Sequence, residues 1–135
     1  MKYLYNIGIA HAEQILILAF LAITFLQSGF DKLFNWKENL AFLNEHFAKT
    51  FLKNNVSLFL RVLTFFEILV GILNVLGIFQ IYISQKTFIG FIAVVLTAKV
   101  LLALLFGQRI AKDYEGAKTV AVYFVIAMLG VFFLK

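Results

Sequence analysis

Four apolar runs, each about as long as a helix needs to be to cross a bilayer, constrain this chain more than any other feature. They cover about residues 10–30, 58–79, 87–106 and 116–134. About 20 helical residues span the hydrocarbon core, and backbone groups in lipid must find their hydrogen bonds within the segment. The sequence therefore predicts an all-α fold, an integral membrane four-helix bundle in which residues 1–135 form a single transmembrane domain.

Composition supports a lipid environment. Hydrophobic residues make up 63% of the chain and charged residues 14%, with a mean hydropathy of +0.96, whereas soluble domains carry about 25% charged residues. A soluble fold would have to expose large apolar patches. The net charge of +5 is typical of lysine-rich and arginine-rich loops beside a membrane. We expect the lipid bilayer, and no nucleic acid, to be the partner of this surface.

The connection between the first two runs has a pattern of its own. Trp36, Leu40, Leu43, Phe47 and Phe51 recur at helical spacing, with charged and amide residues on the other faces. This pattern predicts an amphipathic helix over about residues 33–54, lying in the plane of the membrane interface with its tryptophan at headgroup level. The alternative is a packed loop helix without lipid contact.

The sequence limits the cofactors and predicts an orientation. The chain has no cysteine, which excludes thiolate metal sites and dithiol redox chemistry. Its two histidines, His11 and His46, are predicted on opposite membrane faces, where they could not bracket one haem. No haem, flavin or metal is predicted. Seven lysine and arginine residues fall on the membrane side of the first and third connections, against three on the side of the two termini. This difference predicts that both termini lie outside the cytoplasm.

Ionisable residues at membrane depth are functional suspects by default, and two stand inside the apolar runs. These are Glu67 in the second and Lys99 in the third. At about 1.5 Å per residue, both lie about 18 Å from the membrane face shared by the termini. Gln27 and Tyr123 fall at nearly the same level in the first and fourth runs. The depths predict one polar layer to which every helix contributes.

Helical faces agree with these depths. Thr64, Glu67, Gly71 and Asn74 share one stripe of the second run, and small and polar stripes are what membrane helices turn toward one another. We therefore expect Glu67 and Lys99 to face each other at the centre. One interpretation is a packing network in which they neutralise each other. The other is a pocket for an amphiphile, with the ligand-binding set Gln27, Thr64, Glu67, Asn74, Lys99 and Tyr123.

Two short motifs resemble those of a known family. Phe25, Gly29 and the triplet Lys32-Leu33-Phe34 close the first run, and Glu67-Ile68-Leu69-Val70-Gly71 stands in the second. With four spans and an amphipathic first loop, the chain resembles the DoxX family of small bacterial membrane proteins. The resemblance implies a multi-pass protein of the bacterial cytoplasmic (inner) membrane linked to quinone-dependent oxidoreduction. It also implies family positions at Gly29, Lys32 and Gly71 beside Glu67.

Three functions follow as hypotheses. The first is a quinone- or lipid-binding subunit associated with a membrane oxidoreductase, with quinone as the expected cofactor and protein partners in a membrane complex. In it Lys99 or Tyr123 donates a hydrogen bond to a quinone carbonyl and Glu67 relays a proton. The second is a non-catalytic accessory or scaffold subunit of a larger membrane complex. The third is a small proton-coupled exporter. Whether the chain is catalytic stays open.

Overall fold

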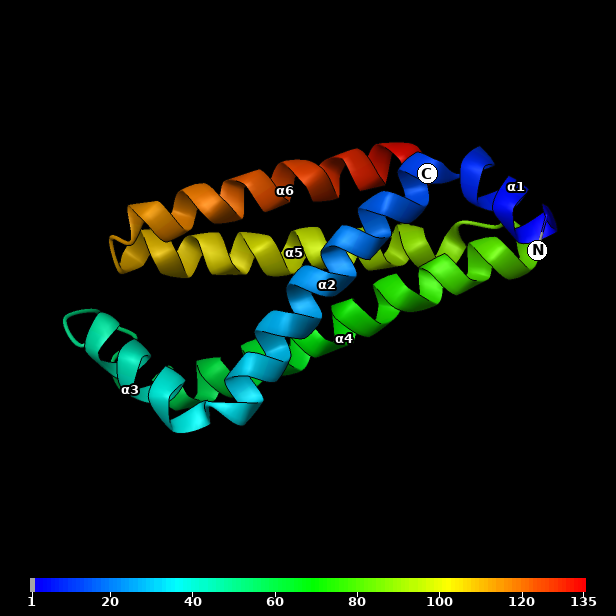
Figure 1. The fold of residues 1–135 in the computed structure, drawn as a ribbon. Helices are drawn as coiled ribbons and strands as arrows, with labels where there is room; N and C mark the ends of the chain where they lie inside the picture. Colours follow the sequence, from blue (N-terminus) through cyan, green and yellow to red (C-terminus); the bar gives the residue numbers. More distant parts are fainter. Residues whose placement is uncertain (1) are drawn as a thin grey trace.

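The computed structural model describes residues 2–135, which form six helices (Figure 1). They are α1 (Lys2–Ala10), α2 (Ala12–Phe34), α3 (Trp36–His46), α4 (Val56–Ser84), α5 (Phe88–Ile110) and α6 (Tyr114–Leu134). Four of them, α2, α4, α5 and α6, are long and apolar enough to cross a membrane. The predicted all-α membrane bundle is confirmed.

The four long helices pack as a ring. In chain order α2 packs on α4, α4 on α5 and α5 on α6, and α2 also touches α6. The connections after α4 and α5 are short, so these helices run antiparallel to their neighbours. Figure 1 shows α1 and the C-terminus at one end of the bundle and α3 with the α5–α6 turn at the other.

Glycines set the closest approaches between the helices. A Cβ added to Gly71 of α4 would lie 2.6 Å from the Leu26 side chain and 3.2 Å from the Leu26 backbone nitrogen of α2. A Cβ on Gly29 of α2 would lie 2.6 Å from Ile68 of α4. These two glycines therefore let α2 and α4 come into contact at a distance that a side chain would prevent.

Helix boundaries differ from the expected spans in ways that affect the site. α2 continues to Phe34, four residues beyond the expected end, which places Lys32 in its last turn rather than in a loop. α4 extends from Val56 to Ser84 and is longer than a perpendicular crossing requires. At the start of the chain, α1 is a separate short helix that ends at Ala10.

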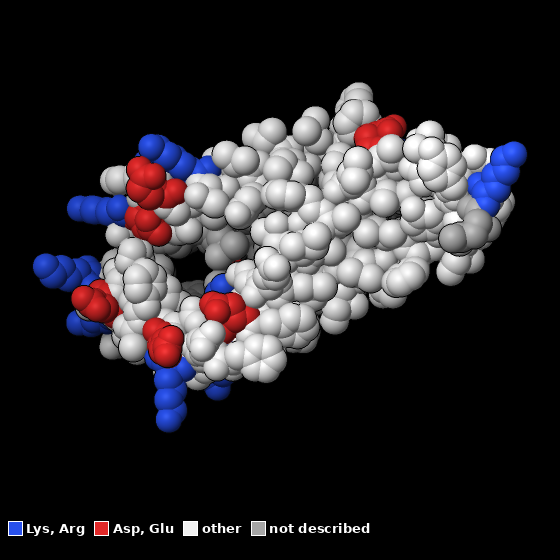
Figure 2. Space-filling model, in the orientation of Figure 1, with Lys and Arg blue, Asp and Glu red and all other residues white. Residues whose placement is uncertain are grey.

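The predicted interfacial segment is a helix only in its first half. α3 covers Trp36–His46, has no buried residue, and is followed by turns up to Asn55. His46 Nε2 lies 3.7 Å from Asp113 Oδ2 in the α5–α6 turn, so the end of α3 lies beside that turn. Figure 2 shows that charged side chains gather here, while the middle of the drawn face is uncharged.

Candidate functional site

Three polar side chains meet between α2 and α4. Lys32 Nζ lies 3.0 Å from Glu67 Oε2 and 3.3 Å from Glu67 Oε1. The same ammonium donates to Ser28 Oγ at 2.7 Å, and the Ser28 hydroxyl donates to Glu67 Oε2 at 2.9 Å. The carboxylate is thus held by one cation and one hydroxyl.

The local sequence explains why these groups converge. Ser28 and Lys32 stand four residues apart on α2 and so share one face of that helix. Gly29 lies between them and brings α2 close to α4, where Glu67 faces inward. The Glu67 side chain is 3% exposed and that of Lys32 is 16% exposed. A buried charge is tolerated only when it is paired and hydrogen-bonded, and this arrangement meets both conditions.

The ion pair forms part of the wall of a cavity. The cavity has a volume of about 370 Å³, and Figure 2 shows a hollow in the surface at this end of the molecule. Gln108 Oε1 is buried there without a hydrogen-bond partner among the described residues. All four long helices contribute to the lining, which consists of Thr24, Phe25, Ser28, Lys32, Glu67, Leu101, Leu104, Gln108, Gly116, Thr119, Val120 and Tyr123.

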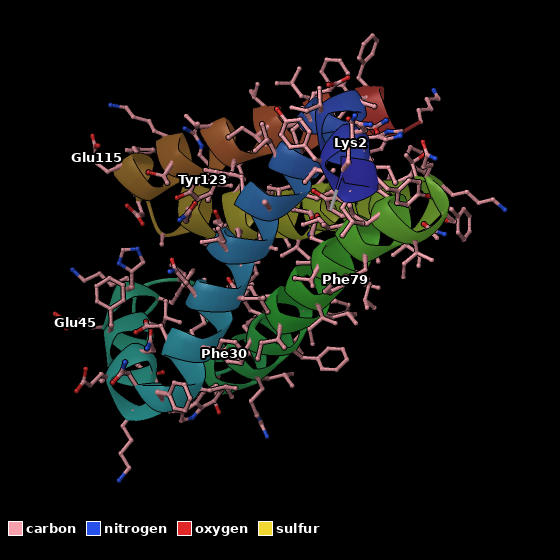
Figure 3. All side chains as sticks on the ribbon, turned by 45° about the vertical axis from the view of Figure 1, so that its right-hand side comes forward. Lys2, Phe30, Glu45, Phe79, Glu115 and Tyr123 are labelled. Carbon is pink, nitrogen blue, oxygen red and sulfur yellow. The ribbon has the colours of Figure 1, made fainter. Side chains whose placement is uncertain are left out.

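The cavity lies where α2 diverges from α6. Near the chain ends the two helices touch, because Gln14 Nε2 donates to the Phe133 carbonyl at 2.8 Å. The last aromatic contact between them is Phe20 against Tyr123, with ring centroids 5.9 Å apart. Beyond it α2 turns away toward α3 (Figure 1). Figure 3 shows Tyr123 on α6 and Phe30 on α2 on opposite sides of the resulting wedge.

The structure brings together two of the six predicted ligand-binding residues. Glu67 and Tyr123 both line the cavity. Lys99 and Gln27 are exposed on the outside of the bundle, so the expected Glu67–Lys99 pair is wrong. The physical reason is the inner face of α5, which is formed by small and aliphatic residues, among them Gly90, Ala93, Val94, Thr97, Ala98 and Leu101. Lys99 lies on the other side of that helix.

Asn74 and Thr64 are buried but serve packing. Asn74 Nδ2 donates to the Val70 carbonyl at 2.7 Å and to Thr97 Oγ1 of α5 at 3.2 Å. The Thr64 hydroxyl donates to the Leu60 carbonyl of its own helix at 2.7 Å. Neither residue lines the cavity beside Glu67. The single predicted layer therefore divides into a polar cavity near α3 and a separate contact between α4 and α5.

Sequence reasoning missed Ser28 and Gln108 as site residues and took Lys32 only as a motif position. A pattern in the sequence could have identified Ser28. Polar residues recur every four positions at Thr24, Ser28 and Lys32, which places them on one helical face. Gln108 gave no such signal, since it stands near the end of a span where amides are common. Among residues 2–135 no group of three or more histidine, aspartate or glutamate side chains could hold a metal ion.

Comparison with known proteins identifies the family of this chain. The model of the DoxX family matches residues 15–108 of this chain, which includes Ser28, Lys32 and Glu67. No curated protein and no solved structure matches the chain significantly.

Proposed function

The chain belongs to the DoxX family of membrane proteins, and from this premise we propose that its cavity binds the head group of a quinone. The observation that supports the proposal most directly is the Lys32–Glu67 ion pair facing a cavity inside the bundle. Ligand pockets commonly have volumes of about 300–1,000 Å³ with a few convergent polar groups. The volume of about 370 Å³ falls in the range for a head group rather than for a whole isoprenoid.

The lining residues fit a carbonyl-bearing ring. Lys32 has three N–H donors. Ser28 takes one of them, and the two carboxylate oxygens of Glu67 can share a second, which would leave the third for a ligand. Tyr123 on α6 adds a hydroxyl donor to the lining residues. The buried, unpartnered Gln108 Oε1 is an acceptor, so it would pair with the hydroxyl group of the reduced quinol form. Phe25, Leu101 and Leu104 supply apolar walls. The wedge between α2 and α6 would let an apolar tail leave toward the acyl chains.

A bound quinone supplies the capacity to take up two electrons and two protons. In this chain Lys32 would donate a hydrogen bond to one carbonyl oxygen and orient the ring. Glu67 would hold or release a proton at its carboxylate, with Ser28 Oγ bridging it to the cavity. The electrons would come from a partner subunit that carries a redox group. The protein would therefore act as a quinone-binding subunit of an oxidoreductase in the bacterial cytoplasmic membrane.

A second function, that of a non-catalytic accessory or scaffold subunit, is favoured by a different observation. Gln27 and Lys99 are polar and exposed on the outer surface of membrane-spanning helices, where lipid is a poor environment for them. Contacts with other subunits would relieve that cost. Under this function, mutation of the cavity would leave the activity of the complex intact.

Photoaffinity labelling tests the first proposal. A quinone that carries an azide on its ring should label peptides from Thr24–Lys32 and Gly116–Tyr123, and excess unmodified quinone should prevent this labelling. An apolar groove at the other end, lined by Lys2, Tyr5, Phe79 and Tyr82 among others, serves as an internal control (Figure 3). Labelling confined to that groove, or labelling that excess quinone does not reduce, would contradict the proposal.

A further inference from the structure

Lys99 is a lysine in the middle of a membrane helix with its side chain on the outside. It stands eleven residues after Phe88 and eleven before Ile110, the two ends of α5. At about 1.5 Å per residue this is about 16 Å from either end, close to the bilayer centre. Its neighbours on the exposed face are Ile92, Leu102 and Phe106. The charge therefore projects from an apolar surface.

Lipid alone is a poor environment for this charge. A lysine at the centre of a spanning helix is costly to insert even on insertion scales. Lysines near helix ends reduce the cost by reaching the interface. From mid-bilayer the headgroups are about 15 Å away, which is farther than a four-carbon stem extends. Loss of the proton would remove the charge, and an acidic group at the same depth on a neighbouring helix is the solution that keeps the ammonium.

The chain itself cannot supply that group. Its seven acidic residues are Glu13, Asp31, Glu38, Glu45, Glu67, Asp113 and Glu115. Of these, Glu67 is buried and paired with Lys32, and the others lie near helix ends or in α3. A second copy of the chain would bring another Lys99 rather than a carboxylate to a symmetric α5–α5 contact.

From this charge pattern we infer that the outer face of α5 around Lys99 docks a transmembrane helix of another protein, which carries a glutamate or aspartate near the middle of the bilayer. In a low-dielectric environment the ammonium and the carboxylate attract each other strongly, and apolar residues on both sides complete the contact. This inference concerns the partner in the proposed complex. It does not depend on what the cavity binds, because Lys99 lies outside the cavity.

Synthetic helices in lipid vesicles provide the test. The chain contains no cysteine, so a single Ser84→Cys substitution at the end of α4 carries a donor fluorophore. The probes are leucine–alanine transmembrane peptides with a central Glu, Gln or Leu and an acceptor fluorophore. We expect the Glu peptide to associate at least about tenfold more tightly with the chain than the Gln peptide does, because a carboxylate adds a charge–charge attraction to the ammonium that an amide lacks.

Matched variants assign the effect to Lys99. Lys99→Met should abolish the preference for Glu, Lys99→Arg should keep it, and Lys86→Met, in the α4–α5 connection, should leave it unchanged. Lys99→Glu should reverse the preference toward a peptide with a central lysine. Equal association of the Glu and Gln peptides would overturn the inference. So would a preference that survives Lys99→Met, or self-association of the chain that depends on Lys99.

Discussion

Lys32 Nζ lies 3.0 Å from Glu67 Oε2, and this contact joins the last turn of α2 to the buried face of α4. The two residues stand 35 positions apart in the chain. Both lie in the part of the chain that the DoxX family model matches, and the nearby Gly29 and Gly71 let α2 and α4 come into close contact. The ion pair therefore links the packing of the bundle to the chemistry of its cavity.

The ion pair should contribute strongly to stability because, among the described residues, neither group forms an ion pair with any other side chain. Lys32→Met should lower the free energy of unfolding by about 3–5 kcal/mol, the usual cost of removing one member of a buried pair. The double variant Lys32→Met/Glu67→Gln should be less destabilised than the two single effects combined, since it removes both charges. The free energies of unfolding can be measured in mixed micelles with an increasing fraction of denaturing detergent. Additive effects would show that the residues do not interact.

Glycine packing gives a steric prediction with a control in the same protein. Gly71→Ala should lower the free energy of unfolding by about 1–3 kcal/mol, because the new Cβ would lie 2.6 Å from Leu26. At Gly107 the nearest atom to an added Cβ is Phe47 Cζ at 3.8 Å. Gly107→Ala should therefore be neutral or slightly stabilising through helix propensity. The same unfolding assay compares them, and equal effects would argue against a tight α2–α4 contact.

The Tyr123 hydroxyl should contribute to ligand affinity without affecting the fold. Tyr123→Phe keeps the ring that contacts Phe20 and removes one hydrogen-bond donor, worth about 0.5–1.5 kcal/mol. Quinone affinity should fall about twofold to twelvefold in a titration, with unchanged stability. Tyr5→Phe, at the opposite groove, should leave the affinity unchanged. A larger effect at Tyr5 would place the ligand in that groove instead.

Membrane orientation can be measured with single cysteines. Most lysine and arginine residues lie at the α3 end, which predicts that this end faces the cytoplasm. In intact cells a membrane-impermeant maleimide should label Lys86→Cys, in the α4–α5 connection, and should label Lys49→Cys only after permeabilisation. The reverse labelling pattern would invert the orientation. Labelling of both in intact cells would contradict a fold in which these two connections lie on opposite membrane faces.

The sequence predicted the bundle well because length and hydropathy determine which segments can cross a bilayer. It also located Glu67 on the inner face of α4, since polar and small residues there share one stripe. Lys99 was placed wrongly because its depth was considered without its face. Gly90, Ala93, Thr97 and Ala98 form the small-residue stripe of α5, and the packing rule applied to that stripe would have turned Lys99 outward.

The true partner of Glu67 was harder to predict because it depends on where α2 ends. With the helix stopped at residue 30, Lys32 looks like a loop charge. With four more residues in helix, it shares a face with Ser28 and reaches inward. From sequence alone, the end of a helix is uncertain by a few residues. Here one additional helical turn at the end of α2 determines whether Lys32 can reach Glu67. The cavity itself depends on the divergence of α2 from α6, which no local pattern encodes.

The most direct test of quinone binding in the cavity is a titration of a short-tailed quinone into the protein in lipid nanodiscs. The affinities of Lys32→Met and Lys37→Met are compared. Both substitutions remove one lysine at the same end of the bundle, but only Lys32 lines the cavity. We expect Lys32→Met to weaken binding about tenfold or more, as the loss of a charge-assisted hydrogen bond would, and Lys37→Met to bind like the unmodified chain. Equal affinity of the two variants, or no saturable binding to the unmodified protein, would contradict this expectation.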